Sequence, residues 1–131
     1  MTEPTAATFK KNEHIVSRKL MERLFCKGSN NSASVFPLRS VYMLTDRQDG
    51  QPALQVLISV SKRHFKRAVK RNRVKRQIRE AYRHQKHCLA ELIPEDKQMA
   101  VAFIWLSDEL MDSKHVENSL KRLLEKIAGR L

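Results

Sequence analysis

The sequence predicts an α+β fold, a two-layer α/β sandwich with elements in the order α-β-β-α-β-α. Apolar residues recur with the helical period in three segments, three other segments have the length and composition of strands, and loop-forming residues separate them. A chain of 131 residues is long enough to build one hydrophobic core. We therefore expect a flexible N-terminal segment over residues 1–11 and a single domain over residues 12–131.

The first helix is expected between Ser17 and Gly28. Apolar side chains fall on one side of this segment, and glycine is frequent just after the last helical turn. The polar residues 29–32 then predict a loop.

Two strands follow, over residues 35–44 and 54–61. The first contains Pro37, which favours an edge position or a bulge because proline cannot donate a ladder hydrogen bond. The second alternates apolar and polar side chains, as a half-buried strand does. A wide turn over residues 46–52 joins them, so we expect the two strands to pair as an antiparallel hairpin.

The C-terminal half supplies a long helix, a central strand and a final helix. The long helix is expected over residues 67–88. Residues 99–106 form a continuous apolar run, which is typical of a strand covered on both faces. Asp112 or Ser113 caps the final helix, whose apolar side chains keep the 3.6-residue period until Gly129.

Positive charge is concentrated in one window of the chain. The formal net charge is +12. Between Lys62 and Lys86 there are twelve lysines or arginines and one acid, Glu80, so this window carries +11 and the rest of the chain +1. Crowding so many like charges opposes folding, and a polyanionic partner would offset the repulsion. A solvated helix face is the alternative, although such faces usually mix both signs.

A spacing of 100° per residue divides the long helix into two sides. One arc is apolar and is expected to pack on the sheet: Val74, Ile78, Ala81, Tyr82, Cys88 and Leu89. The outward side is mainly cationic: Asn72, Arg73, Lys75, Arg76, Arg79, Glu80, Arg83 and Lys86. Arg71 falls at the edge of the apolar arc, so its stem is expected to be buried while its head reaches round. Asn72 is either an N-terminal cap or a polar group for a sugar or base edge.

Guanidinium and ammonium groups bind phosphates, so this helix predicts nucleic-acid binding. A DNA-binding basic zipper would need leucine heptads after Arg83, and Pro94 follows instead. No segment approaches the roughly 20 apolar residues of a membrane span. The two cysteines lack the spacing of a metal site, and we expect them to be reduced thiols. Reduced thiols are typical of the cytoplasm, so we expect a cytoplasmic protein.

No independent active site is expected. His84, His87 and Cys88 have no fourth ligand at a suitable spacing for zinc. The acids at 108–112 precede a helix, where negative charge favours the helix dipole. The three glycines of the chain leave no phosphate-binding loop. The sequence therefore predicts no catalytic residue and no metal site in the protein alone.

The basic window also carries a resemblance. The residues that carry it are Val60-Ser61-Lys62-Arg63, the stretch 67–76 with Arg71-Asn72-Arg73 at its core, and the stretch 78–83. Weaker matches are Lys10-Lys11-Asn12-Glu13, Leu24-Phe25 with Gly28, and Phe36-Pro37-Leu38-Arg39. Over roughly residues 9–128 the chain resembles the bacterial ribonuclease P protein subunit.

The resemblance implies a subunit that binds a catalytic RNA and assists the Mg²⁺-dependent removal of the 5′ leader from precursor tRNA. Its partners would be these two RNAs rather than DNA or a membrane, with the protein monomeric in the complex. No cofactor would be bound by the protein alone, because Mg²⁺ would be held chiefly by the RNA. The fold would have a left-handed βαβ crossover, although right-handed crossovers are the general rule. A structural or ribosomal RNA-binding protein without a role in cleavage is the alternative.

The resemblance also implies two sets of site residues. Those that would bind the catalytic RNA are Lys62, Arg63, Lys66, Arg67, Lys70, Arg71, Asn72, Arg73, Lys75, Arg76, Arg79 and Arg83. A cleft between the sheet and the N-terminal helix would take the leader, near Phe25, Phe36, Leu38, Arg39, Met99 and Val101. Met21 stands where the family often has a second aromatic residue, which makes Phe65 another candidate for stacking.

Overall fold

The computed structural model describes residues 22, 24–25, 31–47, 50 and 52–130. Its strands and helices are β1 (Asn31–Val35), β2 (Leu38–Asp46), β3 (Leu54–Ser59), α2 (Ala68–Ala90), β4 (Lys97–Trp105) and α3 (Ser113–Ala128). The expected N-terminal segment over residues 1–11, and most of the expected first helix, lie outside the described residues.

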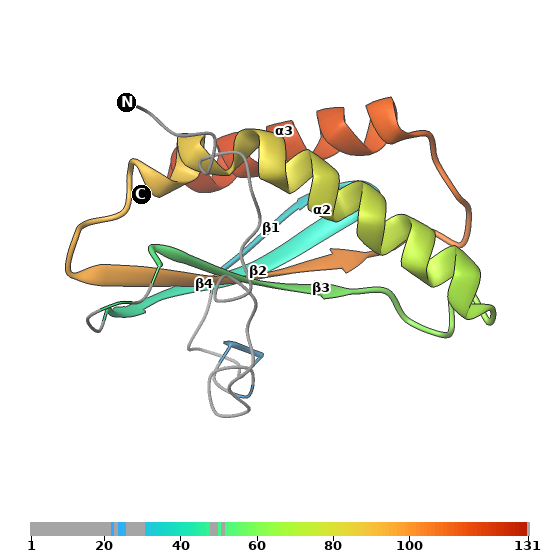
Figure 1. The fold of residues 1–131 in the computed structure, drawn as a ribbon, viewed down its shortest axis with the longest axis horizontal. Coiled ribbons are helices and arrows are strands. Elements are labelled where there is room, and N and C mark those ends of the chain that lie inside the picture. Colours follow the sequence, from blue (N-terminus) through green and yellow to red (C-terminus); the bar gives the residue numbers. More distant parts are fainter. Residues whose placement is uncertain (1–21, 23, 26–30, 48–49, 51, 131) are drawn as a thin grey trace.

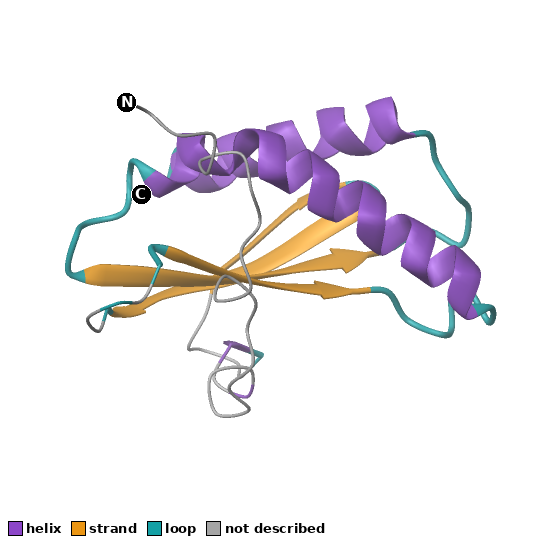
Figure 2. Ribbon diagram, viewed as in Figure 1, coloured by secondary structure: helices purple, strands orange, loops and turns teal. Residues whose placement is uncertain are grey.

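The strands form one sheet in the order β1-β2-β4-β3. β4 pairs antiparallel with β2 and parallel with β3, and α2 joins that parallel pair. Figure 1 shows α2 and α3 together on one face of the sheet, and Figure 2 shows the same two layers by type of element. The predicted α+β class is confirmed.

The predicted antiparallel hairpin between residues 35–44 and 54–61 is wrong. β4 lies between β2 and β3, so those two strands do not pair. The end of β2 pairs with the start of β4 instead, with Asp46 opposite Lys97. Consecutive strands are spatial neighbours only about two-thirds of the time, and here the most apolar strand takes the central position. A wide turn alone does not specify a hairpin.

β1 is a strand that the sequence did not predict. Its residues 31–32 were expected in a loop, and the prediction of one strand over residues 35–44 merges parts of two. The chain reverses at Phe36 and Pro37, so that Val35 pairs with Leu38. Pro37 therefore lies in the turn between two strands rather than at an edge or bulge within one. Asn and Ser in β1 are poor strand formers, and pairing with β2 overrides that preference.

The central strand is covered on both faces, as predicted. Met99, Val101, Phe103 and Trp105 point toward the helices and are fully buried. On the other face Ala100 and Ala102 are fully buried and cluster with side chains from β2 and with Leu24. Because successive side chains on a strand point to opposite faces, large residues pack under the helices, and Ala100 and Ala102 lie on the opposite face beside Leu24.

α2 buries most of the predicted apolar arc, and it packs on α3 as well as on the sheet. Val74, Ile78, Ala81, Tyr82 and Leu89 are buried. Gln77 Nε2 donates to the Met111 carbonyl at 2.9 Å, which ties the helix to the start of α3. Two assignments were wrong: Cys88 is exposed, and Lys86 is buried. On the helical wheel Lys86 lies next to Tyr82 and Leu89, and all three are buried. The buried side of the helix therefore includes Lys86, whose long side chain has an apolar stem.

The ends of α3 follow the prediction. Asp112 is the N-cap, and its side chain accepts from the backbone N–H of His115 at 2.8 Å. Gly129 is the C-cap. The apolar side of the helix is buried between these two residues, so α3 is fixed on the sheet along its length.

Candidate RNA interface

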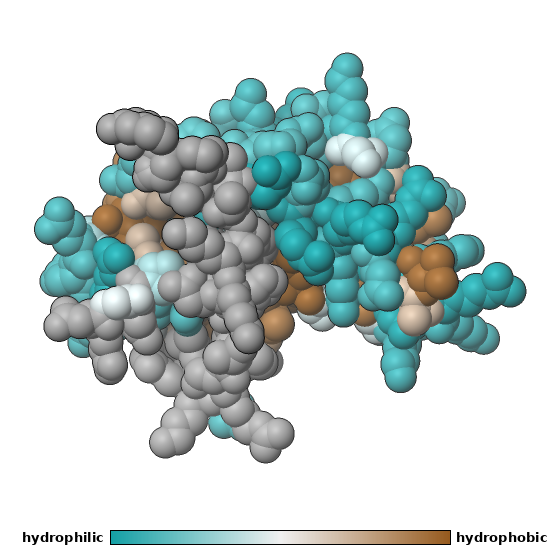
Figure 3. Space-filling model, viewed as in Figure 1, coloured by the Kyte–Doolittle hydropathy of each residue, from teal (hydrophilic) through white to brown (hydrophobic). Residues whose placement is uncertain are grey.

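The basic window forms a single outward surface, which we call the cationic face. Most of its members are exposed: Lys62, Arg63, Lys66, Arg67, Lys70, Asn72, Arg73, Arg76 and Arg79. Three are half-buried: Arg71, Lys75 and Arg83. Figure 3 shows mainly hydrophilic side chains over the region of α2. The helix and the connector before it therefore present most of their cations to solvent.

Three contacts hold the connector, residues 61–67, in place between β3 and α2. Phe65 is 5% exposed and packs into the core. Arg71 Nη1 donates to the carbonyls of Phe65 at 2.8 Å and Lys66 at 2.9 Å. His64 Nδ1 lies 2.6 Å from Asp108 Oδ1 in the loop before α3. The exposed bases Lys62 and Lys66 are thus carried by a fixed loop.

Arg71 is half-buried, and its head turns back to the connector before α2 instead of reaching round to the outward side of the helix. The Arg71 guanidinium is engaged by two backbone carbonyls, whereas the Arg73 guanidinium has no such partner among the described residues. The side chains of Arg73 and Arg76, about one turn apart, are exposed. Neither side chain makes a hydrogen bond or ion pair with any residue that the structure describes. The arginine pair in the core motif therefore divides into one residue that organises the loop and one that faces solvent.

Asn72 is not the helix cap. Arg67 occupies the N-cap position, and its side chain makes no capping hydrogen bond. Asn72 lies inside the helix and is exposed between Arg71 and Arg73. Of the two interpretations of Asn72, only the polar contact remains.

One acid interrupts the cationic face. The hydrogen bond from Arg83 is the main reason that the pKa of Glu80 is lowered, with smaller contributions from the charges of Arg83 and His84. The Arg83 guanidinium is therefore partly neutralised, whereas the three outward arginines at 73, 76 and 79 have no such partner among the described residues. Among the described residues of the helix, the exposed arginines without an acidic partner therefore lie between Arg73 and Arg79.

The residues expected at the leader cleft divide into two groups. Phe25 is 47% and Phe36 62% exposed, and Arg39 is exposed as well. Leu38, Met99 and Val101 are completely buried under the helices, so they have no surface for a leader. The alternation of β2 turns Arg39 to the opposite face from Leu38.

The face opposite the helices was not found from the sequence. Its members include Val41 and Met43 of β2, in a cluster with Leu24, Ala100 and Ala102. The alternation of large and small residues along β4 is the signal that could have separated the two faces. Phe65 is in the core and offers no flat surface for a base, and Met21 lies outside the described residues.

His84, near the end of α2, is engaged with acids rather than with His87. His84 Nδ1 lies 3.3 Å from Glu117 Oε1, and its Nε2 lies 3.7 Å from Glu80 Oε1. In the part of the chain that the structure describes, no three His, Cys, Asp or Glu side chains are grouped to hold a metal ion. Among the same residues, no helix has the length and apolar character needed to cross a membrane.

Comparison with known proteins gives consistent matches. The family model described as Ribonuclease P matches residues 9–128. A protein of Porphyromonas gingivalis named ribonuclease P protein component is 40% identical over 132 residues, covering 100% of this chain and 94% of that protein. A protein of the same name from Chlorobium phaeobacteroides is 30% identical over 128 residues, covering 92% of this chain and 88% of that protein.

Solved structures with a similar fold are RNase P proteins. A mutant of the Staphylococcus aureus protein superposes with a TM-score of 0.68 at 22% identity, covering 89% of both chains. The Thermotoga maritima protein gives a TM-score of 0.60 at 23% identity, covering 83% of this chain and 91% of that one. At these identities the structures support the fold, while the sequence relatives support the family.

Proposed function

The chain belongs to the ribonuclease P protein family, and from this premise we propose that the cationic face holds the catalytic RNA while the exposed side chains of Phe25 and Phe36 meet the leader of precursor tRNA. The family's role is RNA binding, precursor-tRNA binding and leader removal within a ribonucleoprotein. The chain is therefore the protein component of an endoribonuclease that produces the mature 5′ end of tRNA.

The observation that carries the catalytic-RNA assignment is the cationic face itself. Exposed arginines at 73, 76 and 79 have no acidic partner in the described part of the chain, so their charge is available to phosphates. Arg71 and the His64–Asp108 contact fix the adjacent loop, so its bases reach the RNA from a set position. A pre-positioned surface loses less side-chain and loop freedom on binding.

The leader assignment is narrower than the sequence predicted. Its support is the exposure of Phe25, Phe36 and Arg39, since bases stack on open aromatic faces and a guanidinium binds phosphate. The proposed leader site does not include Leu38, Met99 and Val101, because these three residues of the expected cleft are buried. This arrangement places the leader outside the cationic face, so that both RNAs bind at once.

The remaining features of the proposal concern the particle. Cleavage depends on Mg²⁺ held mainly by RNA, the protein acts as a monomer, and the particle works in the cytoplasm. The protein contributes binding and orientation.

Reconstitution tests the proposed function. The purified protein is combined with a catalytic RNA of ribonuclease P and Mg²⁺, and 5′ cleavage of a precursor tRNA is followed at low and moderate salt. We expect cleavage only when protein, RNA and Mg²⁺ are all present at moderate salt. Cleavage by the nuclease-free protein alone, or RNA cleavage that the protein does not enhance, would contradict the proposal.

A further inference from the structure

A second basic surface runs along the edge of the molecule where α3 lies against β1. Three hydrogen bonds join the two elements: Ser119 Oγ to the Phe36 carbonyl at 3.4 Å, Lys126 Nζ to the Ser34 carbonyl at 2.9 Å, and Arg130 Nη1 to the Ser32 carbonyl. The helix therefore runs antiparallel to β1 along its whole length. From Ser119 to Arg130 the helix rises about 16 Å.

The cations of this edge follow a regular spacing. Three basic residues at successive fourth positions lie along it, and all three are exposed: Arg122, Lys126 and Arg130. Like charges four residues apart repel on a helix, so an anionic partner would relieve them. The Arg122 side chain makes no ion pair or hydrogen bond with any of the described residues.

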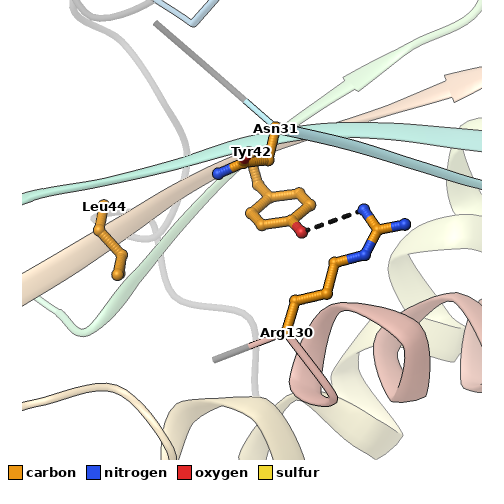
Figure 4. Close-up of a pocket in the computed structure, with 4 residues that line it drawn as sticks. All are labelled: Asn31, Tyr42, Leu44 and Arg130. Carbon is orange, nitrogen blue, oxygen red and sulfur yellow. Dashed lines mark hydrogen bonds between the residues drawn. The ribbon is translucent and has the colours of Figure 1, made fainter.

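Two hollows lie beside these cations. One, of about 470 Å³, is lined by Val35, Arg122, Glu125 and Lys126. The other, of about 310 Å³, lies at the far end of β1 and is lined by Asn31, Tyr42, Leu44 and Arg130. Figure 4 shows the Tyr42 hydroxyl pointing toward the Arg130 guanidinium, which donates to it at 3.4 Å. Leu44 is 45% exposed and forms an apolar wall.

The edge has the parts that a single strand of RNA requires. Proteins bind single strands with a cationic groove for the backbone and with flat or apolar side chains for the bases. Here the exposed Phe36 is at one end and Arg122 and Lys126 lie along the middle. At the other end the half-exposed Leu44 supplies the apolar side chain, since the Tyr42 ring is buried and only its hydroxyl reaches Arg130. Among the described residues that line the two hollows, Glu125 is the one acid, and the bases are Arg122, Lys126 and Arg130.

We propose that the β1–α3 edge is a second RNA-binding surface, which holds the part of the single-stranded leader that lies upstream of the nucleotides at Phe36. This inference rests on the proposed function. The flank of α3 with Arg122 and Lys126 faces β1, whereas the opposite flank contacts α2, where Gln85 Nε2 donates to the Glu117 carbonyl at 3.3 Å. The body of α3 thus separates this edge from the cationic face, which assigns it to the leader rather than to the catalytic RNA.

The test compares two variants in the reconstituted particle. Arg122→Gln/Arg130→Gln removes two charges from the edge, and Lys114→Gln/Lys121→Gln removes two from the outer side of the same helix. Precursor tRNAs are made with leaders shortened one nucleotide at a time. We expect the edge variant to bind long-leader precursors several-fold more weakly, to bind short-leader precursors normally, and to bind the catalytic RNA normally. For long leaders, the slope of log K against log salt should fall by about 0.7 per lost phosphate contact.

Two controls accompany this comparison. Thermal unfolding must show that both double variants fold. The single variant Arg130→Lys, which keeps the charge, should retain most of the long-leader affinity of the unmodified protein. Equal affinities of the two double variants at every leader length would overturn the inference, as would an equal loss for the catalytic RNA. Failure of the proposed function looks different, because the unmodified protein would then show no dependence on leader length and support no cleavage.

Discussion

The connector before α2 should depend on Arg71 for its stability, and Arg73 provides a matched control. Arg71→Ala removes a guanidinium that donates to two carbonyls, those of Phe65 at 2.8 Å and Lys66 at 2.9 Å. Lys66 is exposed, so water can replace the bond to its carbonyl. The bond to Phe65 is part-buried, and its loss leaves a carbonyl that water reaches poorly.

The expected cost follows from that difference. A hydrogen bond to a charged group contributes about 1.5–3 kcal/mol when it is protected from solvent. With one bond part-buried and one exposed, Arg71→Ala should lower the free energy of unfolding by about 1–2 kcal/mol. Arg73→Ala removes the same charge from an exposed side chain, so its effect should stay within about 0.5 kcal/mol.

Urea unfolding followed by circular dichroism measures both variants at the same pH and salt concentration. A shift of the midpoint for Arg71→Ala with an unchanged slope reports a loss of stability alone. In a thermal scan the same cost would appear as a decrease in Tm of roughly 3–8 °C for a chain of this size. Equal midpoints for Arg71→Ala and Arg73→Ala would refute the reasoning, because the loop would then be fixed by other contacts.

Three further predictions concern the core, the sheet edge and acid stability. Ile78→Asp should leave the protein unfolded by circular dichroism, because Ile78 is fully buried and an unpaired carboxylate there costs several kcal/mol, whereas Ile78→Val should fold. Phe36→Leu should weaken binding of precursors with leaders by about 1–3 kcal/mol per unstacked base, while affinity for leaderless tRNA is unchanged; wild-type affinity for every leader would contradict it. The hydrogen bond from Lys97 lowers the pKa of Asp46, so the pair stabilises the fold above the ordinary carboxyl pKa and less as pH falls through the lowered one. Unfolding midpoints of Asp46→Asn and wild type should therefore converge in acid, and a gap that is independent of pH would argue against the ion pair.

Local patterns predicted α2 and α3 well because the spacing of their apolar residues reports burial directly. The arc with Val74, Ile78 and Tyr82 is buried as expected, and Asp112 caps α3. The pairing of strands was not predictable in the same way. Whether residue 46 turns back to residue 54 or pairs with residue 97 depends on contacts distant in sequence, which no local window contains.

The candidate site shows the same division. Exposed arginines on α2 follow from charge and period together, so Arg73 and Arg76 lie on the surface as expected. The facing of sheet residues requires knowing which side the helices cover, and that information lies in the tertiary fold. The family resemblance implied that Leu38 and Met99 lie near the leader, whereas the fold buries both completely.

The central claim is that the N-terminal half of α2 binds the catalytic RNA through phosphate contacts. The most direct measurement is the salt dependence of RNA affinity for Arg73→Gln, Arg76→Gln and Arg79→Gln, with Lys121→Gln on α3 as the control. Each α2 variant should keep its unfolding midpoint and lower the slope of log K against log salt by about 0.7 to 0.9, while Lys121→Gln leaves the slope unchanged. Slopes equal to that of the unmodified protein for all three α2 variants would contradict the claim and place the catalytic RNA on another surface.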